Sequence, residues 1–552
     1  MDYKKLAEIL FPNNKYTIEE IEQKYPKRNL PEGAEVTRFA PSPTGFMHLG
    51  GFFQTVLDYN IAKRSGGVFY LRIEDTDAKR EVSGASAIVM NILTGYGYTP
   101  DEYQLKGGVT VGEYGPYYQS ERGEIYRAYA KKLVSEGKAF PCFCRKTEGL
   151  EDVEEKREKK FEIGINEDKD PCRNLTIEQI IQNVNEGKKF AIRLKSQGNG
   201  DKKIKFHDGS KGDVEIIENC SDAILLKNDL MPTYHFAHAV DDTLMGTTVV
   251  VRGEEWLPSY PLHKEIFEAL GFKQPKYIHT PLIYKIDENG NKRKISKRKD
   301  PEFYMGFFEE QGYDKQAVVE YLINLLNSSF EIWRAKNPKT DISEFPFDGF
   351  NITAIAPVFD IVKLNDISKE IISRYSAEKC YAELLAWARE YSRENVDYLV
   401  KDREYVTKIL NIDREKPKPR KDIYKWSMFF EKFDYMFSNP SAIEIEDEEY
   451  YNFELVVDKY KEYLDLSSKE AWFDKVKKMA GELGFATDNK EYKANPQNFK
   501  GNVATVCEYI RLAITGQRNS PDLYEIMTLL GEKEVLKRLS RGEVAVVKYL
   551  NS

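Results

Sequence analysis

The stretch RFAPSPTGFMHLGG, residues 38–51, carries the first residues whose types and spacing could do chemistry. Gly50 and Gly51 would let a ligand approach the main chain, and N–H groups at the start of a helix attract an anion. The spacing matches neither the G-x-x-x-x-G-K-[ST] phosphate loop nor the G-x-G-x-x-G dinucleotide motif. We therefore predict a nucleotide site in which His48 is the basic donor, with packing or helix capping as the alternative role.

Two basic clusters come later in the chain. NKRKISKRK, residues 291–299, follows an Asn289-Gly290 pair that predicts a turn after a strand. REKPKPRK, residues 414–421, contains two prolines and lies in an otherwise helical region. Such runs are usually solvated loops, so charge alone assigns no function to either cluster.

These stretches need a sheet to position them. Residues 36–42 and 68–75 are predicted strands, and the apolar spacing between them predicts a helix that stops at Gly66-Gly67. A strand, a helix and a strand in this order indicate a parallel sheet with helices on its faces. Doubly wound sheets bind ligands at the carboxyl edge of their strands, where residues 38–51 would lie.

The chain is long enough for several domains, at 552 residues. Strand signals return in GTTVVVRGEEW and KYIHTPLIY after an interruption that contains the charged segment EDVEEKREKKFEIGINEDKD. The fold class we expect is an α/β Rossmann-type parallel-sheet domain with an inserted α+β domain, followed by an all-α C-terminal region. The expected parts are an N-terminal extension 1–35, two halves of the sheet domain 36–119 and 223–313, an insertion 120–222, and helical regions 314–400 and 401–552.

Composition limits the class of protein. The net charge of −8 argues against a general nucleic-acid coat, because phosphate binding relies on clustered Lys and Arg. Six cysteines in so long a chain do not form a disulfide framework. No apolar run approaches the roughly 20 residues of a membrane span, and the N-terminus lacks the apolar block of a secretory signal. We therefore expect a cytoplasmic protein.

Several segments, taken in order, resemble one family. HLGG and KISKR look like the two signature motifs of class I aminoacyl-tRNA synthetases, and their order and positions agree with that class. The flanking segments resemble bacterial-type glutamyl-tRNA synthetases over residues 35–539. They are RFAPSPTGFMHLGG, FYLRIEDTD, YYQSERGEIYRAYA, LLKNDLMPTYHFAHAVDDTLMGTTVVVRGEEWLPS, APVFDIVKLN and RLAITGQRNSPDLYEIMTLLG.

The resemblance implies a glutamate–tRNA ligase, which activates L-glutamate with ATP and Mg²⁺ and transfers it to the terminal adenosine of tRNA(Glu). It also implies a monomer in which the insertion 120–222 grips the acceptor end, the helical region 314–400 contacts the tRNA stem and the helical domain 401–552 binds the anticodon. In that context residues 414–421 suit a linker that touches RNA backbone. Neither step needs a covalent enzyme intermediate, so catalysis should rest on positioning and charge stabilisation.

The resemblance assigns residues to two subsites. Of the ATP residues, His48 and Lys297 would be catalytic and Trp256 would stack near the adenine or line the pocket. The ATP set is His48, Gly50, Gly51, Lys294, Ser296, Lys297 and Trp256. The glutamate set is Arg38, Ala40, Ser42, Glu74, Tyr234 and Arg252, in which two arginines would bind the carboxylates and Glu74 the ammonium.

Two further groups are considered. Cys142, Cys144 and Cys172 resemble three ligands of a zinc site in some family members, but no fourth ligand follows Cys172. Zinc in a structural site needs four ligands, so zinc stays uncertain and buried thiols are the alternative. Asp241-Asp242 looks like a metal pair and is interpreted as architecture.

Other functions remain to be tested against this one. A glutaminyl-tRNA synthetase is disfavoured by Pro41-Ser42-Pro43-Thr44 and by the helical tail. A truncated paralogue that modifies a tRNA base would end soon after KISKR. A small-molecule nucleotidylyltransferase would have no use for the helical region. A catalytically inactive RNA-binding paralogue is disfavoured because His48 and Lys297 are both present.

Overall fold

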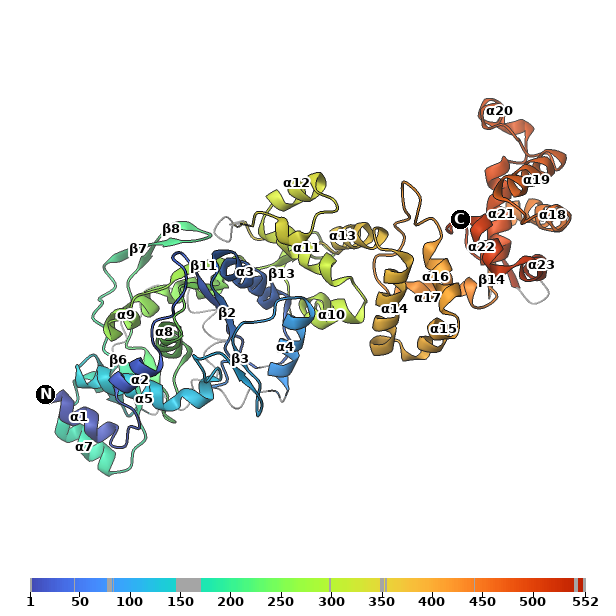
Figure 1. The fold of residues 1–552 in the computed structure, drawn as a ribbon. Coiled ribbons are helices and arrows are strands. Elements are labelled where there is room, and N and C mark those ends of the chain that lie inside the picture. The colour runs from blue at the N-terminus through green and yellow to red at the C-terminus, as the bar shows by residue number, and fades with distance from the viewer. Residues whose placement is uncertain are drawn as a thin grey trace. The chain divides into compact units, whose positions relative to one another are not determined.

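The computed structural model divides into two compact units, Met1–Phe307 with Val319–Asp360, and Phe308–Val318 with Ile361–Ser552 (Figure 1). Each unit has its own buried apolar core. The structure describes residues 2–43, 45–76, 82, 84–144, 170–296, 299–347, 352, 355–440, 442–540 and 545–549.

The first unit contains the strand, helix and strand expected near the N-terminus. They are β1 (Val36–Phe39), α3 (Leu49–Ser65) and β2 (Val68–Leu71). β1 and β2 are parallel, with Arg38 opposite Tyr70. This pairing brings the residues that follow both strands to one edge.

A second parallel pair continues this part of the unit. β10 (Val249–Gly253) and β11 (Lys276–Thr280) are joined through α9 (Tyr260–Leu270) and place Arg252 opposite His279. The Thr248 amide donates to the Val36 carbonyl at 2.9 Å, which connects the β10 end to β1. The return of parallel strands after the interruption is confirmed.

The interruption itself forms β structure of two kinds. Antiparallel β5 (Ala139–Cys142) and β6 (Ala191–Leu194) make one small sheet with β9 (Ile224–Leu226), which lies just beyond the expected end of the insertion at residue 222. The hairpin β7 (Lys203–Asp208) and β8 (Gly212–Ile217) extends the β10–β11 pair, because Asp208 pairs with Tyr277 of β11.

The first 35 residues form part of the same core. α1 (Tyr3–Leu10) and α2 (Ile18–Lys24) bury apolar side chains with α5 (Gly123–Ser135). Beyond α2, Arg28 donates to both oxygens of Glu102 at 2.7 Å. The extension is therefore structured by tertiary contacts.

A hairpin presents the KISKR segment. β12 (Tyr284–Ile286) and β13 (Lys292–Lys294) pair antiparallel, and Gly290 adopts a φ of +79° in the turn predicted from Asn289-Gly290. The other helices and short strands of the first unit are α4 (Ala85–Gly95), β3 (Tyr103–Gln104), β4 (Thr110–Val111), α7 (Ile177–Asn185), α8 (Tyr234–Leu244) and α12 (Ser329–Lys336). Two helices, α10 (Met305–Glu310) and α11 (Lys315–Leu326), have residues in both units. Single 3₁₀ turns cover Gln119–Arg122, Pro171–Asn174, Glu254–Ser259, Pro301–Phe303 and Ile342–Glu344.

The second unit is largely helical, as predicted, but it is not all-α. Its parallel pair β14 (Ala442–Glu446) and β15 (Ala545–Tyr549) joins segments about a hundred residues apart, which local sequence patterns do not predict. Its helices are α13 (Ile361–Ser373), α14 (Ala377–Tyr391), α15 (Val396–Lys401), α16 (Arg403–Asn411), α17 (Met428–Phe433), α18 (Asp447–Tyr463), α19 (Lys469–Glu482), α20 (Asn489–Ala494), α21 (Val503–Thr515), α22 (Leu523–Leu530) and α23 (Glu532–Ser540), with 3₁₀ turns Arg393–Asn395, Asp434–Met436 and Pro496–Asn498.

Two arginines of the basic stretch 414–421 are buried, although the sequence suggests an exposed linker. Arg414 is buried and donates to the carbonyls of Leu410 and Ile372, both at 2.8 Å. Arg420 has only 7% of its side chain exposed, with Nε 3.4 Å from Asp422. Both arginine side chains are buried, so the RNA contact expected of this stretch stays a prediction for its exposed lysines.

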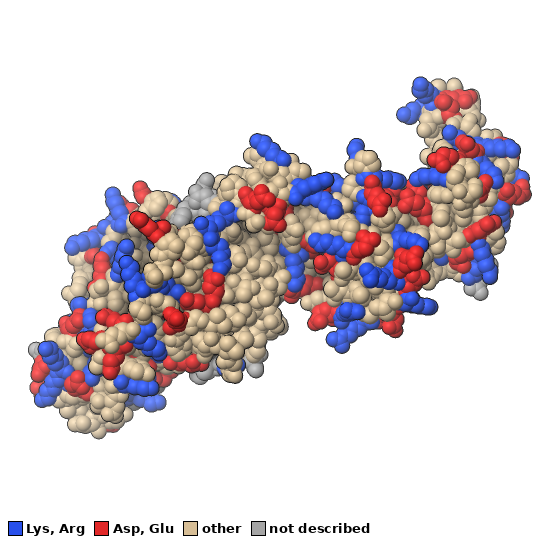
Figure 2. Space-filling model, in the orientation of Figure 1, with Lys and Arg blue, Asp and Glu red and all other residues tan. Residues whose placement is uncertain are grey.

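Charge on the surface is mixed. Lysine and arginine alternate with aspartate and glutamate over the face shown in Figure 2, in keeping with a modest net charge of −8. Among the described helices, none has the length and apolar character needed to cross a bilayer.

Candidate active site

The carboxyl ends of β1 and β2 carry two of the candidate glutamate residues. Arg38 of β1 is buried, with Nε 3.3 Å from Asp242 and Nη1 donating to the Val251 carbonyl at 3.2 Å. Glu74 follows β2, and its Oε1 accepts from Arg72 at 3.2 Å. The Glu74 amide donates to the Pro41 carbonyl at 3.0 Å, so the chain after β1, with half-buried Ala40 and exposed Ser42, runs beside Glu74.

Glu74 has an unusual titration. Burial raises the pKa of its carboxyl to about 7, against the lowering effect of Arg72 and Arg38. Only 10% of the side chain is exposed. The carboxyl group therefore changes charge near neutral pH. This suits an acid whose ionised form is stabilised by a cationic group of a bound ligand.

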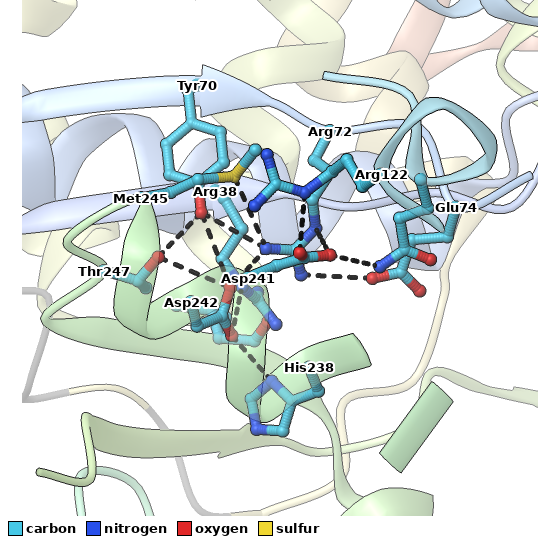
Figure 3. Close-up of polar contacts among 12 residues, drawn as sticks. Arg38, Tyr70, Arg72, Glu74, Arg122, His238, Asp241, Asp242, Met245 and Thr247 are labelled. Carbon is cyan, nitrogen blue, oxygen red and sulfur yellow. Dashed lines mark hydrogen bonds and ion pairs between the residues drawn. The ribbon is translucent and has the colours of Figure 1, made fainter. Parts of the chain in front are cut away.

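Arg38 and Glu74 belong to a group of buried ion pairs (Figure 3). Asp242 accepts from Arg72 at 2.5 Å, and Asp241 accepts from Arg122 at 2.7 Å. Asp241 also accepts from Gln119 and Tyr126, so neither aspartate is left over as an unpaired ligand. We call this the aspartate network: Arg38, Arg72, Arg122, Asp241 and Asp242.

Sequence reasoning interpreted Asp241 and Asp242 as architecture, and the structure shows what they support. Both lie on α8, which begins at Tyr234, and Asp242 is the counter-ion of Arg38. His238, one turn before Asp242 on the same helix, places Nδ1 2.6 Å from its carboxylate. Burial lowers the pKa of His238 to about 4 despite that aspartate, so His238 is neutral at pH 7.

Tyr234 joins this network to Arg252. Burial raises the pKa of its phenol, while nearby Arg252 lowers it, Glu74 raises it and Arg38 lowers it. Its ring centre lies 4.3 Å from that of Trp256, which is half-buried in the turn after β10. The structure thus brings Arg38, Glu74, Tyr234 and Arg252 together. Trp256 lies beside this group, next to the Tyr234 ring.

Arg252 is surrounded by histidines. Four of the six histidines of the chain lie between residues 235 and 279. Arg252 donates Nε to His279 at 3.0 Å, and its Nη1 lies 2.8 Å from His263 Nδ1. We call His235, His263 and His279 the histidine cluster. Sequence reasoning missed it, although the unusual density of histidines was a signal.

The HLGG turn forms the start of α3. His48 is its N-cap residue, and its Nδ1 accepts from the Gly51 amide at 2.9 Å. The ring lies 5.3 Å from that of Phe303. A side chain at position 51 would meet the His48 and Phe39 rings at 3.3–3.4 Å, which explains a glycine there. His48 is exposed, so capping and contact with a ligand are compatible.

The KISKR segment is anchored by an acid that sequence reasoning did not select. Asp300 accepts from both Nη atoms of Arg293, at 2.7 and 2.6 Å, and from the Ser296 amide at 2.8 Å. These contacts lower the pKa of Asp300 to about 2, so it stays ionised. Lys294 is exposed at the end of β13. Lys297 and Arg298 lie outside the described residues.

Three cysteines and one aspartate form a separate group. One ligand atom from each of Cys142, Cys144, Asp170 and Cys172 lies within 4.8 Å of the others. The Cys144 and Cys172 sulfurs are 3.4 Å apart, and Cys142 Sγ lies 3.1 Å from Asp170. The fourth ligand that the sequence lacked after Cys172 is therefore available two residues before it.

Comparison with known proteins agrees with this geometry. Residues 35–334 match the family model "tRNA synthetases class I (E and Q), catalytic domain", and residues 380–543 match "Anticodon binding domain". A glutamate–tRNA ligase of Clostridium perfringens is 44% identical over 98% of this chain and 100% of its own length. One of Acetivibrio thermocellus is 43% identical over the same shares.

A solved structure extends the likeness to the fold. The crystal structure of a glutamate tRNA ligase from Elizabethkingia meningosepticum, in complex with its amino acid, is 26% identical, with a TM-score of 0.72, over 92% of this chain and 98% of that one. A class I catalytic domain with parallel strands and a largely helical anticodon-binding domain is thereby confirmed for this chain. The chain belongs to the class I (E and Q) aminoacyl-tRNA synthetases, and within them to the glutamate–tRNA ligases.

Proposed function

We propose that this chain activates L-glutamate with ATP and then transfers it to the terminal adenosine of tRNA(Glu). In the first step an oxygen of the α-carboxylate bonds to the α-phosphorus, and the bond to the β-phosphate breaks to release pyrophosphate. In the second step a ribose hydroxyl attacks the activated carbonyl and AMP leaves. Both steps move negative charge, so positioned donors would do most of the catalysis.

One observation carries the choice of glutamate. Arg38, Arg252, Glu74 and Tyr234 come from distant parts of the chain and converge on one place. Two guanidinium groups suit two carboxylates, and an acid suits an ammonium. Glutamine would leave one arginine without a charged partner, at a cost of about 2–5 kcal/mol when buried.

ATP would bind at the HLGG turn and the KISKR segment. The amides at the start of α3 favour a phosphate. Because Nδ1 of His48 accepts from Gly51, its Nε2 is the nitrogen that would donate to the triphosphate. Lys294, Ser296 and Lys297 would supply the other side, with the loop held by Asp300. Mg²⁺ would travel with the triphosphate and neutralise its charge.

The remaining partners follow from the rest of the chain. We assign the acceptor end of the tRNA to the inserted segment 120–222 and the anticodon to the helical region from 401, which overlaps the anticodon-binding match at 380–543. The candidate residues of the reaction all come from one chain, so a monomer would suffice. None of the six cysteines forms a disulfide, which fits a cytoplasmic enzyme.

The cysteine group fits zinc better than the sequence indicated. Three thiols and one carboxylate give the four ligands of a structural zinc site. Burial raises the pKa of the Cys172 thiol to about 11, so these thiols would stay protonated unless a metal ion displaced the protons. We therefore propose zinc held by Cys142, Cys144, Asp170 and Cys172.

Metal analysis of the purified chain tests the zinc site. We expect about one zinc per chain, lost in Cys144→Ala and retained in Cys507→Ala, a cysteine of α21 in the other unit. Asp170→Asn should weaken zinc retention in a chelator titration. Absence of zinc from a preparation grown with added zinc would leave the group as ordinary buried thiols.

Pyrophosphate exchange tests the main reaction. Glutamate-dependent ATP–pyrophosphate exchange should occur in the presence of tRNA(Glu) and should fall about 100- to 1,000-fold in Lys297→Ala, while Lys299→Ala, an exposed neighbour, should exchange like the wild type. His48→Asn keeps a good N-cap residue for α3 and removes the imidazole, so it should lose activity without losing stability.

The tRNA used decides the remaining alternatives. Charging of tRNA(Glu) alone indicates a discriminating enzyme, and charging of tRNA(Gln) as well indicates a non-discriminating one. Binding of RNA without any exchange would contradict the proposed reaction and support an inactive paralogue.

A further inference from the structure

Arg252 is held in a fixed orientation by two imidazoles. It is 4% exposed, and its guanidinium lies over the Tyr277 ring at 4.7 Å from the ring centre. Nε donates to His279 Nε2 at 3.0 Å, and Nη1 lies 2.8 Å from His263 Nδ1. Since a guanidinium can only donate, both ring nitrogens must be lone-pair acceptors.

A carboxylate selects the tautomer of His279. Nδ1 of that ring lies 2.6 Å from Asp208 Oδ2. Burial opposes ionisation of Asp208, but hydrogen bonds from His279 and from the β7–β8 turn lower its pKa to about 2, so it is an ionised acceptor. The ring proton is therefore on Nδ1, and Nε2 is left with the lone pair that Arg252 needs. His263 is oriented in the same way by His235, at 2.8 Å from its other nitrogen.

This support differs from that of the neighbouring arginines. Arg38, Arg72 and Arg122 each form an ion pair with Asp241 or Asp242. Among the residues that the structure describes, no ion pair joins Arg252 to a carboxylate. Neutral acceptors orient a cation without cancelling its charge, so the field of Arg252 remains available to an anionic ligand.

One nitrogen of the Arg252 guanidinium remains beyond the two contacts with imidazoles. Nη2 is buried and makes no hydrogen bond to the described residues. Tyr234, which also faces Glu74 and Arg38, lies beside this guanidinium. A buried donor without a partner is costly unless a ligand satisfies it.

We propose that Asp208 and His279 are positioning residues for glutamate. They hold Arg252 through a neutral acceptor, so that Nη2 and the uncancelled charge face a carboxylate of the substrate. This inference rests on the proposed function and adds to it a relay, Asp208 to His279 to Arg252, that begins in the inserted segment. Neither residue touches the reacting atoms, so the relay acts on glutamate binding more than on turnover.

Asp208→Asn breaks the relay with little change of shape. Oδ1 of Asp208 accepts from the Ser210 amide, the Ser210 hydroxyl and the Lys211 amide, at 2.9–3.0 Å. These donors would hold the amide oxygen of an asparagine at the Oδ1 position, and its NH₂ would then face His279. The ring would adopt the other tautomer and direct an N–H at Arg252.

The test compares KM for glutamate, KM for ATP and kcat in aminoacylation of tRNA(Glu). For Asp208→Asn and His279→Leu we expect KM for glutamate to rise about 10- to 100-fold, the usual effect of a hydrogen bond to a charged group, with KM for ATP and kcat changing less than about threefold. His279→Gln, whose amide oxygen can accept from Arg252, should recover most of the loss. His207→Leu, an exposed histidine on the same hairpin, is the matched control.

The outcomes separate this inference from the proposed function. An unchanged KM for glutamate in both Asp208→Asn and His279→Leu would overturn the relay while leaving the function intact. A parallel rise of both KM values, or no recovery in His279→Gln, would indicate a merely structural role and also overturn it. If the wild-type chain fails to charge tRNA(Glu), the proposed function itself fails. Should His279→Leu fail to fold, Asp208→Asn alone decides.

Discussion

The two sides of the candidate glutamate pocket hold their arginines in opposite ways. In the aspartate network, three buried arginines face two buried aspartates at 2.5–3.3 Å. In the histidine cluster, Arg252 is oriented by uncharged rings and ion-paired with no carboxylate of the described residues. The first arrangement suits a scaffold, because its charges cancel, and the second suits a binding group, because its charge does not.

The difference teaches that burial of an arginine does not by itself identify a ligand contact. Arg72 and Arg122 are fully buried, yet each is ion-paired with a protein carboxylate. The partner of a buried arginine determines the effect of substitution. Removing one member of a buried ion pair leaves an uncompensated buried charge, whereas removing Arg252 leaves only neutral imidazole rings without a donor. The two sides should therefore respond differently to substitution, in stability on one side and in binding on the other.

The largest effect is expected from breaking the aspartate network. Asp242→Ala leaves Arg38 and Arg72 without their shared counter-ion and should lower the free energy of unfolding by about 3–5 kcal/mol. Urea unfolding followed by circular dichroism measures the change. Asp213→Ala, an aspartate with 93% of its side chain exposed, should lie within about 0.5 kcal/mol of the wild type. A loss below 1 kcal/mol at Asp242 would contradict the scaffold role.

Breaking the other side should affect binding more than folding. Arg252→Gln removes the uncancelled charge and should weaken glutamate binding by about 2–5 kcal/mol, or roughly 30-fold or more. Its melting temperature should fall less than that of Asp242→Ala. Isothermal titration with glutamate, in the presence of tRNA, gives the affinity. Similar glutamate affinities in Arg252→Gln and wild type would remove the distinction between the two sides.

A pH profile sharpens the comparison further. Glu74, whose pKa is raised to about 7 by burial, must be ionised to pair with an ammonium. Below pH 7 the protonated form prevails, so kcat/KM for glutamate should fall about tenfold per pH unit, while kcat, which reports the complex, should change less. Burial lowers the pKa of both His263 and His279, which favours their neutral forms.

Glu74→Gln is the control for this assignment. It should lower kcat/KM at pH 8 and remove the inflection near pH 7. Persistence of that inflection in the variant would assign the titration to a different group.

The smallest effect is expected at the residue between the two sides. Tyr234→Phe removes one neutral hydroxyl from a position that faces Arg252, Glu74 and Arg38. A neutral hydrogen bond contributes about 0.5–1.5 kcal/mol, so KM for glutamate should rise about two- to tenfold. The ring keeps its contact with Trp256, so KM for ATP should stay unchanged. If KM for ATP rose more than KM for glutamate, Tyr234 and Trp256 would belong to the nucleotide side of the site.

Much of the fold could be predicted because its elements have local signals. The parallel strands β1, β2, β10 and β11 appear as short apolar runs, and the helices of the tail appear as apolar residues at helical spacing. The β14–β15 pair was missed, since its two strands lie about a hundred residues apart and neither is long. The N-terminal extension gave no sign that its apolar side chains complete a core.

The candidate site was predictable in its residue types but not in its contacts. The family resemblance placed Arg38, Glu74, Tyr234 and Arg252 in one pocket, and the structure brings them together. It gave no reason to select Asp208 or His279, because each acts through a partner far along the chain. Asp300 lies close in sequence to its partners Arg293 and Ser296, but no motif marked it. The zinc candidate shows the same limit, since Asp170 precedes Cys172 and becomes a ligand candidate only through its distance from the thiols.

The sequence by itself determined the family, the order of the elements and the two motifs, because these depend on residue types at short spacing. Only the tertiary structure decided which arginine is neutralised and which is not. The charge that a guanidinium presents to a ligand depends on the groups within about 3 Å of it. For Arg252 those groups are two imidazoles, and their protons are placed by Asp208 and His235.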